Sequence, residues 1–155
     1  MMKLKKSILA SIIIWVLGCI FAFALFLTPQ RKPSIYSNRT QTEQITVKVE
    51  KNHSYPEIIY LLTNPTSSSY YIKPYVILEY YDGQNWNEVL TRTRKSASEL
   101  GYDAIATCIP AHDIVLGTLH FNTLSTLEDG KYRLLFPSDN GEEVIISQPF
   151  DLINL

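Results

Sequence analysis

Histidine, cysteine and acidic side chains are the residues of this chain that could hold a metal ion or act on a substrate. His53, His112 and His120 lie too far apart in sequence for a short metal-binding motif. His112 and Asp113 follow Pro110 and favour a turn with a local hydrogen bond. Other acidic residues lie in predicted turns without the alternating ligands of a calcium loop; they are Asp82, Asp129, Asp139, Glu142 and Glu143. We therefore expect no bound metal ion and no cofactor.

Nucleophilic chemistry has no better support in the sequence. Cys19 lies inside a long apolar run, so Cys108 has no partner for a disulfide within the folded part. Residues 104–109 around Cys108 resemble a strand without an adjacent base, which predicts a buried and unreactive thiol. Ser67, Ser68 and Ser69 indicate a flexible loop and not a nucleophile elbow. The sequence therefore predicts a protein that is not an enzyme.

Aromatic residues are the more suggestive feature. Several of the ten tyrosines gather around one predicted strand: Tyr70, Tyr71, Tyr75, Tyr80 and Tyr81. Because neighbours along a strand face opposite ways, some of these rings must point outward, where they can stack on sugars or on a protein partner. Trp86 follows the turn after this strand and is placed to cover the open end of the core. We predict an aromatic binding patch formed by Tyr71, Tyr75, Tyr81 and Trp86.

Charge excludes one class of partner. Without Lys3, Lys5 and Lys6, 11 of the 14 basic residues remain against 15 acidic ones, so the rest of the chain has a formal net charge of −4. We expect no nucleic-acid partner. A small basic stretch, Arg92 to Lys95, can contact an anionic polymer or lipid headgroups, but a solvated loop is the favoured interpretation.

Residues 1–27 predict an export or membrane segment. Residues 8–27 carry no charge and follow the basic start, and this length spans a bilayer as a helix. We favour an uncleaved signal anchor that leaves a single-pass protein in the cell membrane with its C-terminal domain outside the cytoplasm. A secretory signal peptide cleaved after Ala24 and a lipoprotein anchored at Cys19 are the alternatives.

The remainder of the chain predicts a tether and one β domain. Residues 28–43 contain two prolines and no apolar period, which is typical of a linker. From residue 44 to residue 155, alternating apolar residues and frequent turn signals predict short strands, and Asp82 and Gly83 form the turn of a hairpin. The predicted strands are 45–50, 58–63, 75–81, 86–90, 104–109, 114–121 (with a bulge at Gly117), 132–136 and 144–147, and residues 150–152 complete the last pairing after Pro149. This pattern favours an all-β, antiparallel sandwich of two sheets with about seven or eight strands in Greek-key order.

One local motif predicts a specific contact. Glu128, Gly130 and Tyr132 occupy alternate positions ahead of a strand. This spacing resembles the tyrosine corner, in which a phenol ties an arch connection to nearby backbone. We therefore assign Gly130 and Tyr132 to a structural corner.

The order of motifs over residues 44–155 resembles the bacterial immunoglobulin-like (Big-type) domains of exported and cell-surface proteins. The motifs are Leu-Glu-Tyr-Tyr-Asp-Gly at 78–83 with Trp86, Leu-Thr-Asn-Pro-Thr at 62–66, and Gly-Lys-Tyr-Arg at 130–133. Leu134 stands where antibody-type domains place a cysteine, so apolar packing replaces the disulfide between sheets. The resemblance implies a membrane-anchored, immunoglobulin-like module that binds or spaces, with no catalytic residue. Its expected partners are the membrane, through the N-terminal helix, and another envelope protein or a polysaccharide; a carbohydrate-binding module is the alternative function.

Overall fold

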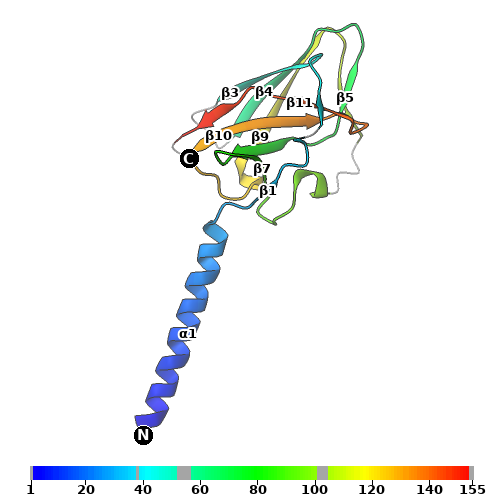
Figure 1. Ribbon diagram of the computed structural model, residues 1–155. Coiled ribbons are helices and arrows are strands. Elements are labelled where there is room, and N and C mark those ends of the chain that lie inside the picture. Colours follow the sequence, from blue (N-terminus) through cyan, green and yellow to red (C-terminus); the bar gives the residue numbers. More distant parts are fainter. Residues whose placement is uncertain (1, 38, 52–56, 101–104, 154–155) are drawn as a thin grey trace.

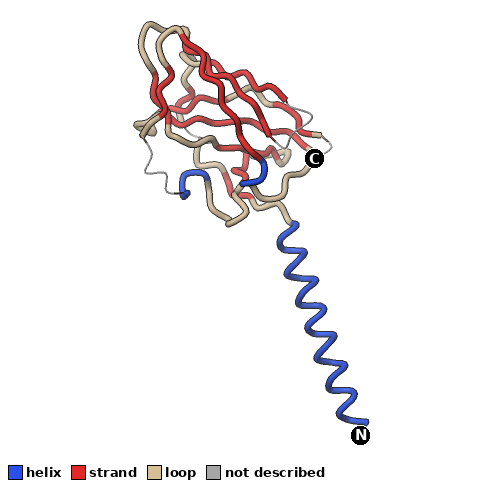
Figure 2. The backbone as a smooth tube through the Cα atoms, turned by 180° about the vertical axis from the view of Figure 1, so that it is seen from behind, coloured by secondary structure: helices blue, strands red, loops and turns tan. Residues whose placement is uncertain are grey.

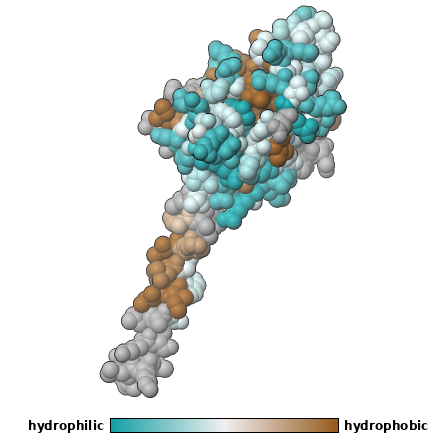
Figure 3. Space-filling view, in the orientation of Figure 1, coloured by the Kyte–Doolittle hydropathy of each residue, from teal (hydrophilic) through white to brown (hydrophobic). Residues whose placement is uncertain are grey.

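A long helix precedes a β-rich domain and extends away from it (Figure 1). The structure is a computed structural model that describes the backbone of residues 2–37, 39–51, 57–100 and 105–153, and their side chains except at 2–10, 25–27 and 51. The helix, α1 (Met2–Leu27), presents exposed side chains throughout residues 11–24, and its described surface is mostly apolar (Figure 3). Within the described part of the chain, no helix combines the length and the apolarity that crossing a membrane requires.

The described residues of the domain form twelve strands and two short 3-10 helices. The strands are β1 (Arg31–Pro33), β2 (Thr40–Gln41), β3 (Thr46–Lys51), β4 (Glu57–Asn64), β5 (Tyr70–Ile72), β6 (Ile77–Tyr81), β7 (Trp86–Val89), β8 (Thr107–Ile109), β9 (Asp113–His120), β10 (Gly130–Pro137), β11 (Glu143–Ile146) and β12 (Phe150–Leu152). The 3-10 helices are η1 (Ala97–Leu100) and η2 (Phe121–Thr123). The sequence does not predict β1, β2 and β5, because strands of two or three residues are too short to show an alternating pattern.

Two sheets pack face to face around one main core. The larger sheet has the strand order β1-β7-β6-β10-β11-β2, with β12 also paired to β10, and the smaller sheet has the order β3-β4-β9. Leu78, Leu134 and Phe136 of the larger sheet meet Ile58 and Leu62 of β4 in a buried cluster. Figure 2 shows that strands make up the body of the domain, with loops gathered at its ends. The architecture is therefore mostly β, as the alternating pattern predicts.

A third, two-stranded sheet continues the smaller one. β5 pairs with β8 beyond a break in the β4–β9 ladder, and the fully buried Asn64 lies at this break. Its Nδ2 donates hydrogen bonds to the carbonyls of Ser68 (2.9 Å) and Ile109 (3.0 Å), and its Oδ1 accepts one from the Thr66 amide (3.0 Å). The buried Asn64 amide therefore supplies hydrogen bonds between the two sheets at the point where backbone pairing is interrupted.

The residues just after α1 belong to the larger sheet. We call residues 30–42 the strap, because β1 pairs with β7 at one edge of this sheet and β2 pairs with β11 at the other. Between them Tyr36, which is 9% exposed, packs on the outer face of the sheet against Ile77, Leu135 and Val144. The structure therefore differs from the tether expected over 28–43, and a domain that starts at residue 44 omits two strands of its own sheet.

Gly117 also has a different role from the predicted bulge. The β4–β9 register continues without interruption through the pair Tyr60 and Gly117. A Cβ atom at position 117 would lie 2.3 Å from the Tyr60 ring. Glycine is therefore needed here for a close approach of an aromatic side chain, which a sequence pattern does not distinguish from a bulge.

The strap gives a first prediction. Tyr36→Ala should lower the free energy of unfolding by about 3 kcal/mol, because it removes a large buried side chain that packs the strap on the sheet. Ile35→Ala is the matched control: its side chain is 59% exposed, so we expect a change below about 0.5 kcal/mol. Urea unfolding of the full chain measures both. If both variants lose equally little free energy of unfolding, the strap is not packed on the sheet.

Candidate functional site

The structure brings together two of the four residues of the predicted aromatic patch. Tyr81 and Trp86 are paired across β6 and β7, with ring centroids 5.1 Å apart and planes tilted by 43°. Tyr75 packs instead with the cluster beneath the strap, and Tyr71, which is 53% exposed, lies on β5. Trp86 faces outward against Arg133, whose guanidinium carbon is 4.3 Å from the ring centroid, and so does not cover the core. The two tilted rings form an angled aromatic surface instead of one flat platform.

The expectation of a buried Cys108 thiol is wrong. Cys108 is exposed, since it alternates with the fully buried Ile109 along β8 and points to the other side of the strand. Its neighbour across the ladder is the exposed Tyr71. The apolar neighbours of Cys108 in sequence hid this orientation, because β8 is only three residues long.

The histidines do not come together. His112 is exposed and has a positive φ of 56° in the turn between β8 and β9, which agrees with the expected turn. His120 Nδ1 lies 3.1 Å from Glu57 Oε2 at the end of β9, and His53 lies outside the described residues. Among the residues that the structure describes, no three metal-binding side chains form a group.

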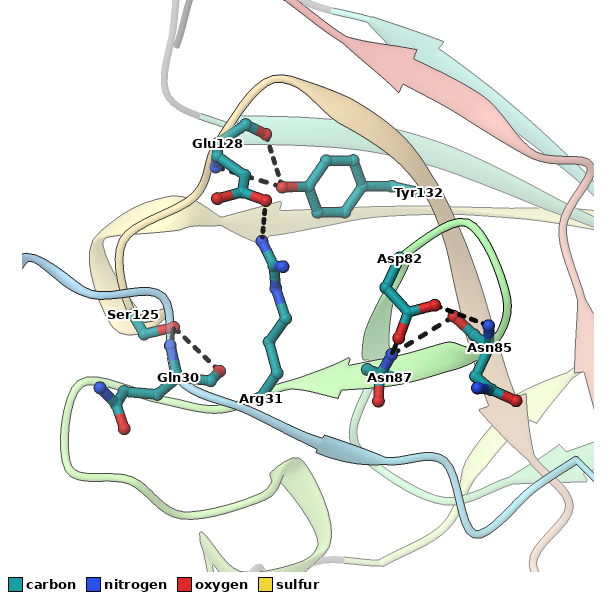
Figure 4. Close-up of polar contacts among 8 residues, drawn as sticks. All are labelled: Gln30, Arg31, Asp82, Asn85, Asn87, Ser125, Glu128 and Tyr132. Carbon is teal, nitrogen blue, oxygen red and sulfur yellow. Dashed lines mark hydrogen bonds and ion pairs between the residues drawn. The ribbon is translucent and has the colours of Figure 1, made fainter.

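The predicted corner at Tyr132 is present. The Tyr132 hydroxyl donates a 2.7 Å hydrogen bond to the Glu128 carbonyl and accepts a weaker one from the Glu128 amide (Figure 4). Gly130 lies so close to Tyr80 that a Cβ atom would come within 2.5 Å of the ring. These contacts fix the arch that enters β10.

The strap is attached to this corner. Arg31 Nη2 lies 2.9 Å from Glu128 Oε1, and the Arg31 guanidinium carbon lies 3.5 Å from the centroid of the Tyr80 ring. The Gln30 amide donates a hydrogen bond to Ser125 Oγ (3.2 Å), and the Leu90 amide donates one to the Gln30 carbonyl (2.9 Å). Hydrogen bonding to Arg31 holds the pKa of Glu128 below its usual value.

We call Gln30, Arg31, Tyr80, Ser125, Glu128 and Tyr132 the clamp. It fixes the chain to the domain three residues after the end of α1. Sequence reasoning identified Tyr132 and Gly130 but missed Arg31, because its partner Glu128 is almost a hundred positions away in sequence.

Two buried carboxylates lie under the strap. Glu79 and Glu88 are neighbours across β6 and β7 and are 0% and 2% exposed. Arg133 Nε and Nη2 each lie 2.7 Å from Glu79 Oε2. Glu88 accepts a hydrogen bond from the Ala97 amide (3.0 Å), and Lys32 Nζ lies 3.5 Å from its other oxygen. Such burial keeps substrates away from both groups, so their arrangement suits structure better than acid–base catalysis.

An apolar cleft of about 370 Å³ lies between the two sheets, along the β9 edge of the smaller one. Its walls come from both sheets and from the segments beside them: Tyr60, Leu62, Leu78, Val89, Leu100, Val115, Leu116, Leu119 and Leu124 are among the lining residues. Lys73 and His120 also line it, and none of the described residues along it is acidic. No sequence pattern indicated this cleft, because the gap between two sheets depends on packing across both.

Comparisons with known proteins identify no family for this chain. No family model matches it, and no curated protein matches it. Among solved structures it is similar to one described as "X-ray structure of Northeast Structural Genomics Consortium target SoR45". The two share 18% sequence identity with a TM-score of 0.42, over 75% of this chain and 95% of the other. A similarity at this level carries no argument about fold or function.

The corner gives a second prediction. Tyr132→Phe should cost about 0.5–1.5 kcal/mol of stability, because it removes the hydrogen bond that the fully buried Tyr132 side chain makes with the Glu128 carbonyl. Tyr71→Phe is the matched control, since this side chain is exposed and we expect almost no change. Thermal and urea unfolding measure the difference. If Tyr132→Phe is as stable as Tyr71→Phe, the corner is not a stabilising contact.

The carboxylates give a third prediction, on pH. Burial raises the pKa of Glu88, so Glu88 favours folding below its unfolded pKa of about 4.3, and this contribution is lost as pH rises through its folded pKa. We therefore expect Glu88→Gln to become more stable relative to the parent between pH 4 and pH 7.

Asp82 provides a control of opposite sign for this prediction. Hydrogen bonds from the Asn85 and Gln84 amides and from Asn87 lower the pKa of Asp82. The loss caused by Asp82→Asn should therefore be greatest at neutral pH and should disappear as pH falls below about 3.9. Urea midpoints across this pH range test both variants, and a parallel pH dependence for the two would refute the assignment.

Proposed function

We propose that this protein is a membrane-anchored, extracytoplasmic immunoglobulin-like module that acts by binding or by spacing, without chemistry of its own. The observation that carries the proposal is the attachment of the strap: pairing with the domain begins at Gln30, three residues after α1 ends. A helix joined so closely to a sheet suits a protein whose domain is held next to its anchor. A free tether would instead let the domain move independently of the helix.

Membrane attachment rests on the amino-acid sequence of α1. Residues 8–27 carry no charged side chain, and lysines at positions 3, 5 and 6 precede them. Of these residues, 8–10 and 25–27 have no described side chains. In the described part of α1, large apolar side chains are exposed, among them Ile14 (71%), Trp15 (77%) and Phe21 (67%). Exposed apolar surface of this kind favours contact with lipid or with another apolar surface.

An immunoglobulin-like assignment is supported by three local features. Two sheets pack face to face, the phenol of Tyr132 ties the arch before β10, and Leu134 packs in the core where antibody-type domains place a cysteine. The arch joins η2 to β10, a strand paired on both sides. These features support the architecture and not any particular ligand.

The noncatalytic part of the proposal rests on how the acidic and nucleophilic groups are used. Glu79, Glu88 and Glu128 are each engaged by a cation of the strap or of β10. The exposed Cys108 thiol has Tyr71 as its partner across the ladder, not a histidine. Glu88 and Glu128 thus hold the strap, and Glu79 links β6 to β10, which suits a structural role for these carboxylates.

Carbohydrate binding is the second candidate, and Tyr81 and Trp86 are the residues that favour it. Both rings are partly exposed and lie together on the outer face of β6 and β7. Trp86→Ala should then abolish retention on envelope polysaccharide, while Tyr71→Ala leaves it unchanged. Equal retention of the two variants would remove this candidate.

Membrane location and orientation give the fourth prediction. The full chain should remain with membranes after alkaline carbonate extraction. A membrane-impermeant maleimide added to intact cells should label it at Cys108, because this thiol is exposed and Cys19 lies within α1. Cys108→Ser is the control and should lose the label. Carbonate-soluble protein, or labelling of Cys108 only after lysis, would contradict the proposal.

A further inference from the structure

The cleft has the size and lining of a ligand site for an apolar chain. Its volume of about 370 Å³ falls within the range of known ligand pockets, roughly 300–1,000 Å³. Val115 and Leu119 of β9 line one side, and Leu78 and Val89 of the larger sheet line the other. In the described part of the chain, β9 pairs with β4 alone, so the cleft lies along an edge of the smaller sheet. Aliphatic walls from two sheets favour an aliphatic occupant.

Buried packing determines the shape of this cleft. The Tyr60 ring lies against Gly117, and its centroid is 4.9 Å from that of the buried Phe136. Tyr60 and Gly117 both line the cleft. Its wall is therefore built on the main core and is more than a shallow surface depression.

Charge around the cleft favours an anionic group on the occupant. Lys73 and His120 are the basic side chains among the described lining residues, and each also faces a carboxylate: Lys73 Nζ lies 3.6 Å from Asp139 Oδ1, and His120 faces Glu57. At the His120 end, Arg92 donates hydrogen bonds from its amide to the Thr123 carbonyl and from Nε to the Leu124 carbonyl, both at 3.2 Å. Thr123 and Leu124 line the cleft, so the basic stretch that begins at Arg92 borders it.

This basic end of the cleft lies beside the clamp. Thr91 and Leu124, which line the cleft, form a β-bridge with each other. The next residue, Ser125, is hydrogen-bonded to Gln30, three residues after α1. If α1 lies in a bilayer, as proposed above, the basic end of the cleft lies close to the lipid headgroups. The membrane is then the nearest source of an apolar chain with an anionic head.

We propose that the cleft binds one acyl chain of an anionic amphiphile, with the chain between the two sheets and the anionic head at the basic end near Arg92 and His120. This proposal rests on the membrane location proposed above. A free fatty acid and an anionic phospholipid share the required chemistry. The experiment below separates these two sources.

Photocrosslinking of the full chain in zwitterionic lipid nanodiscs tests the proposal. One arm adds an anionic phospholipid with a diazirine near the end of one acyl chain, and the other adds a diazirine fatty acid. Mass spectrometry should locate crosslinks at the cleft walls, around Val89, Val115 and Leu119, as well as in α1. Crosslinks in either arm support the proposal and identify the source. Crosslinks confined to α1 in both arms overturn it.

A pair of variants on β9 provides the matched control. Val115→Trp places a large ring in the cleft and should reduce its crosslinks at least tenfold. Ile114→Trp changes the neighbouring residue, which is 58% exposed, and should leave the crosslinks unchanged. Equal crosslinking of the two variants at the cleft walls overturns the proposal. Arg92→Gln should weaken binding of the anionic lipid more than binding of a neutral lipid of the same chain length.

Competition with the parent protein keeps the test decisive if Val115→Trp does not fold. Unlabelled fatty acids of increasing length should compete about fourfold better for each added methylene, until the cleft is filled. No dependence on chain length overturns the proposal. The proposal is also overturned if an extended peptide is found bound at the edge of β9 in place of the acyl chain.

These outcomes are distinct from those for the proposed function. A protein retained in membranes without crosslinks in the cleft loses this inference alone. A protein found outside membranes that still binds fatty acids in a chain-length series loses the proposed location but keeps the site.

Discussion

Closure of the larger sheet by the strap is the constraint on which the other features depend. An unpaired strand edge attracts other chains; β1 covers β7 at one edge of this sheet, and β2 covers β11 at the other, where β12 also pairs with β10. Tyr36 packs between them on the outer face, and Arg31 reaches the corner on the inner side of the sheet. The described residues of the strap thus extend the sheet, cover part of its outer face and join the domain to the helix.

Because the strap covers the outer face of the larger sheet, two carboxylates on that face are buried. Glu79 and Glu88 would be ordinary exposed residues on the outer face of β6 and β7 if nothing covered them, and under the strap and η1 they need partners. Glu88 receives Lys32 from the strap and the Ala97 amide from η1, so one carboxylate connects three segments. At the other side of the domain, β9 has no comparable strand along its outer edge among the described residues, and the apolar cleft lies there. The two edges therefore suit different roles, attachment at one and binding at the other.

Sequence patterns were most informative where strands are long and alternate. β3, β4, β9 and β10 lie where the apolar pattern predicts them, and the spacing of Gly130 and Tyr132 predicted a contact that the structure contains. The pattern failed for β1 and β2, whose few residues pair with partners more than fifty positions away, and for Cys108, whose orientation depends on which face of a three-residue strand turns inward. The cleft and the clamp depend on contacts between distant segments, and no local property of Arg31 or Gly117 encodes them. The predicted aromatic patch separated because adjacency in sequence does not place Tyr71, Tyr75 and Tyr81 on one surface.

Amide hydrogen exchange of the full chain tests the central claim most directly, because it reports the strap and the core in one measurement. The informative amides are Ser34, Thr42 and Leu90, which donate to the carbonyls of Trp86, Val144 and Gln30. We expect them to be protected to within about tenfold of the Ser147 amide, which bonds to Leu134 in the larger sheet. Exchange of the three amides at the rate of an unstructured chain, with Ser147 still protected, would show that residues 30–42 are a tether after all and would contradict the account.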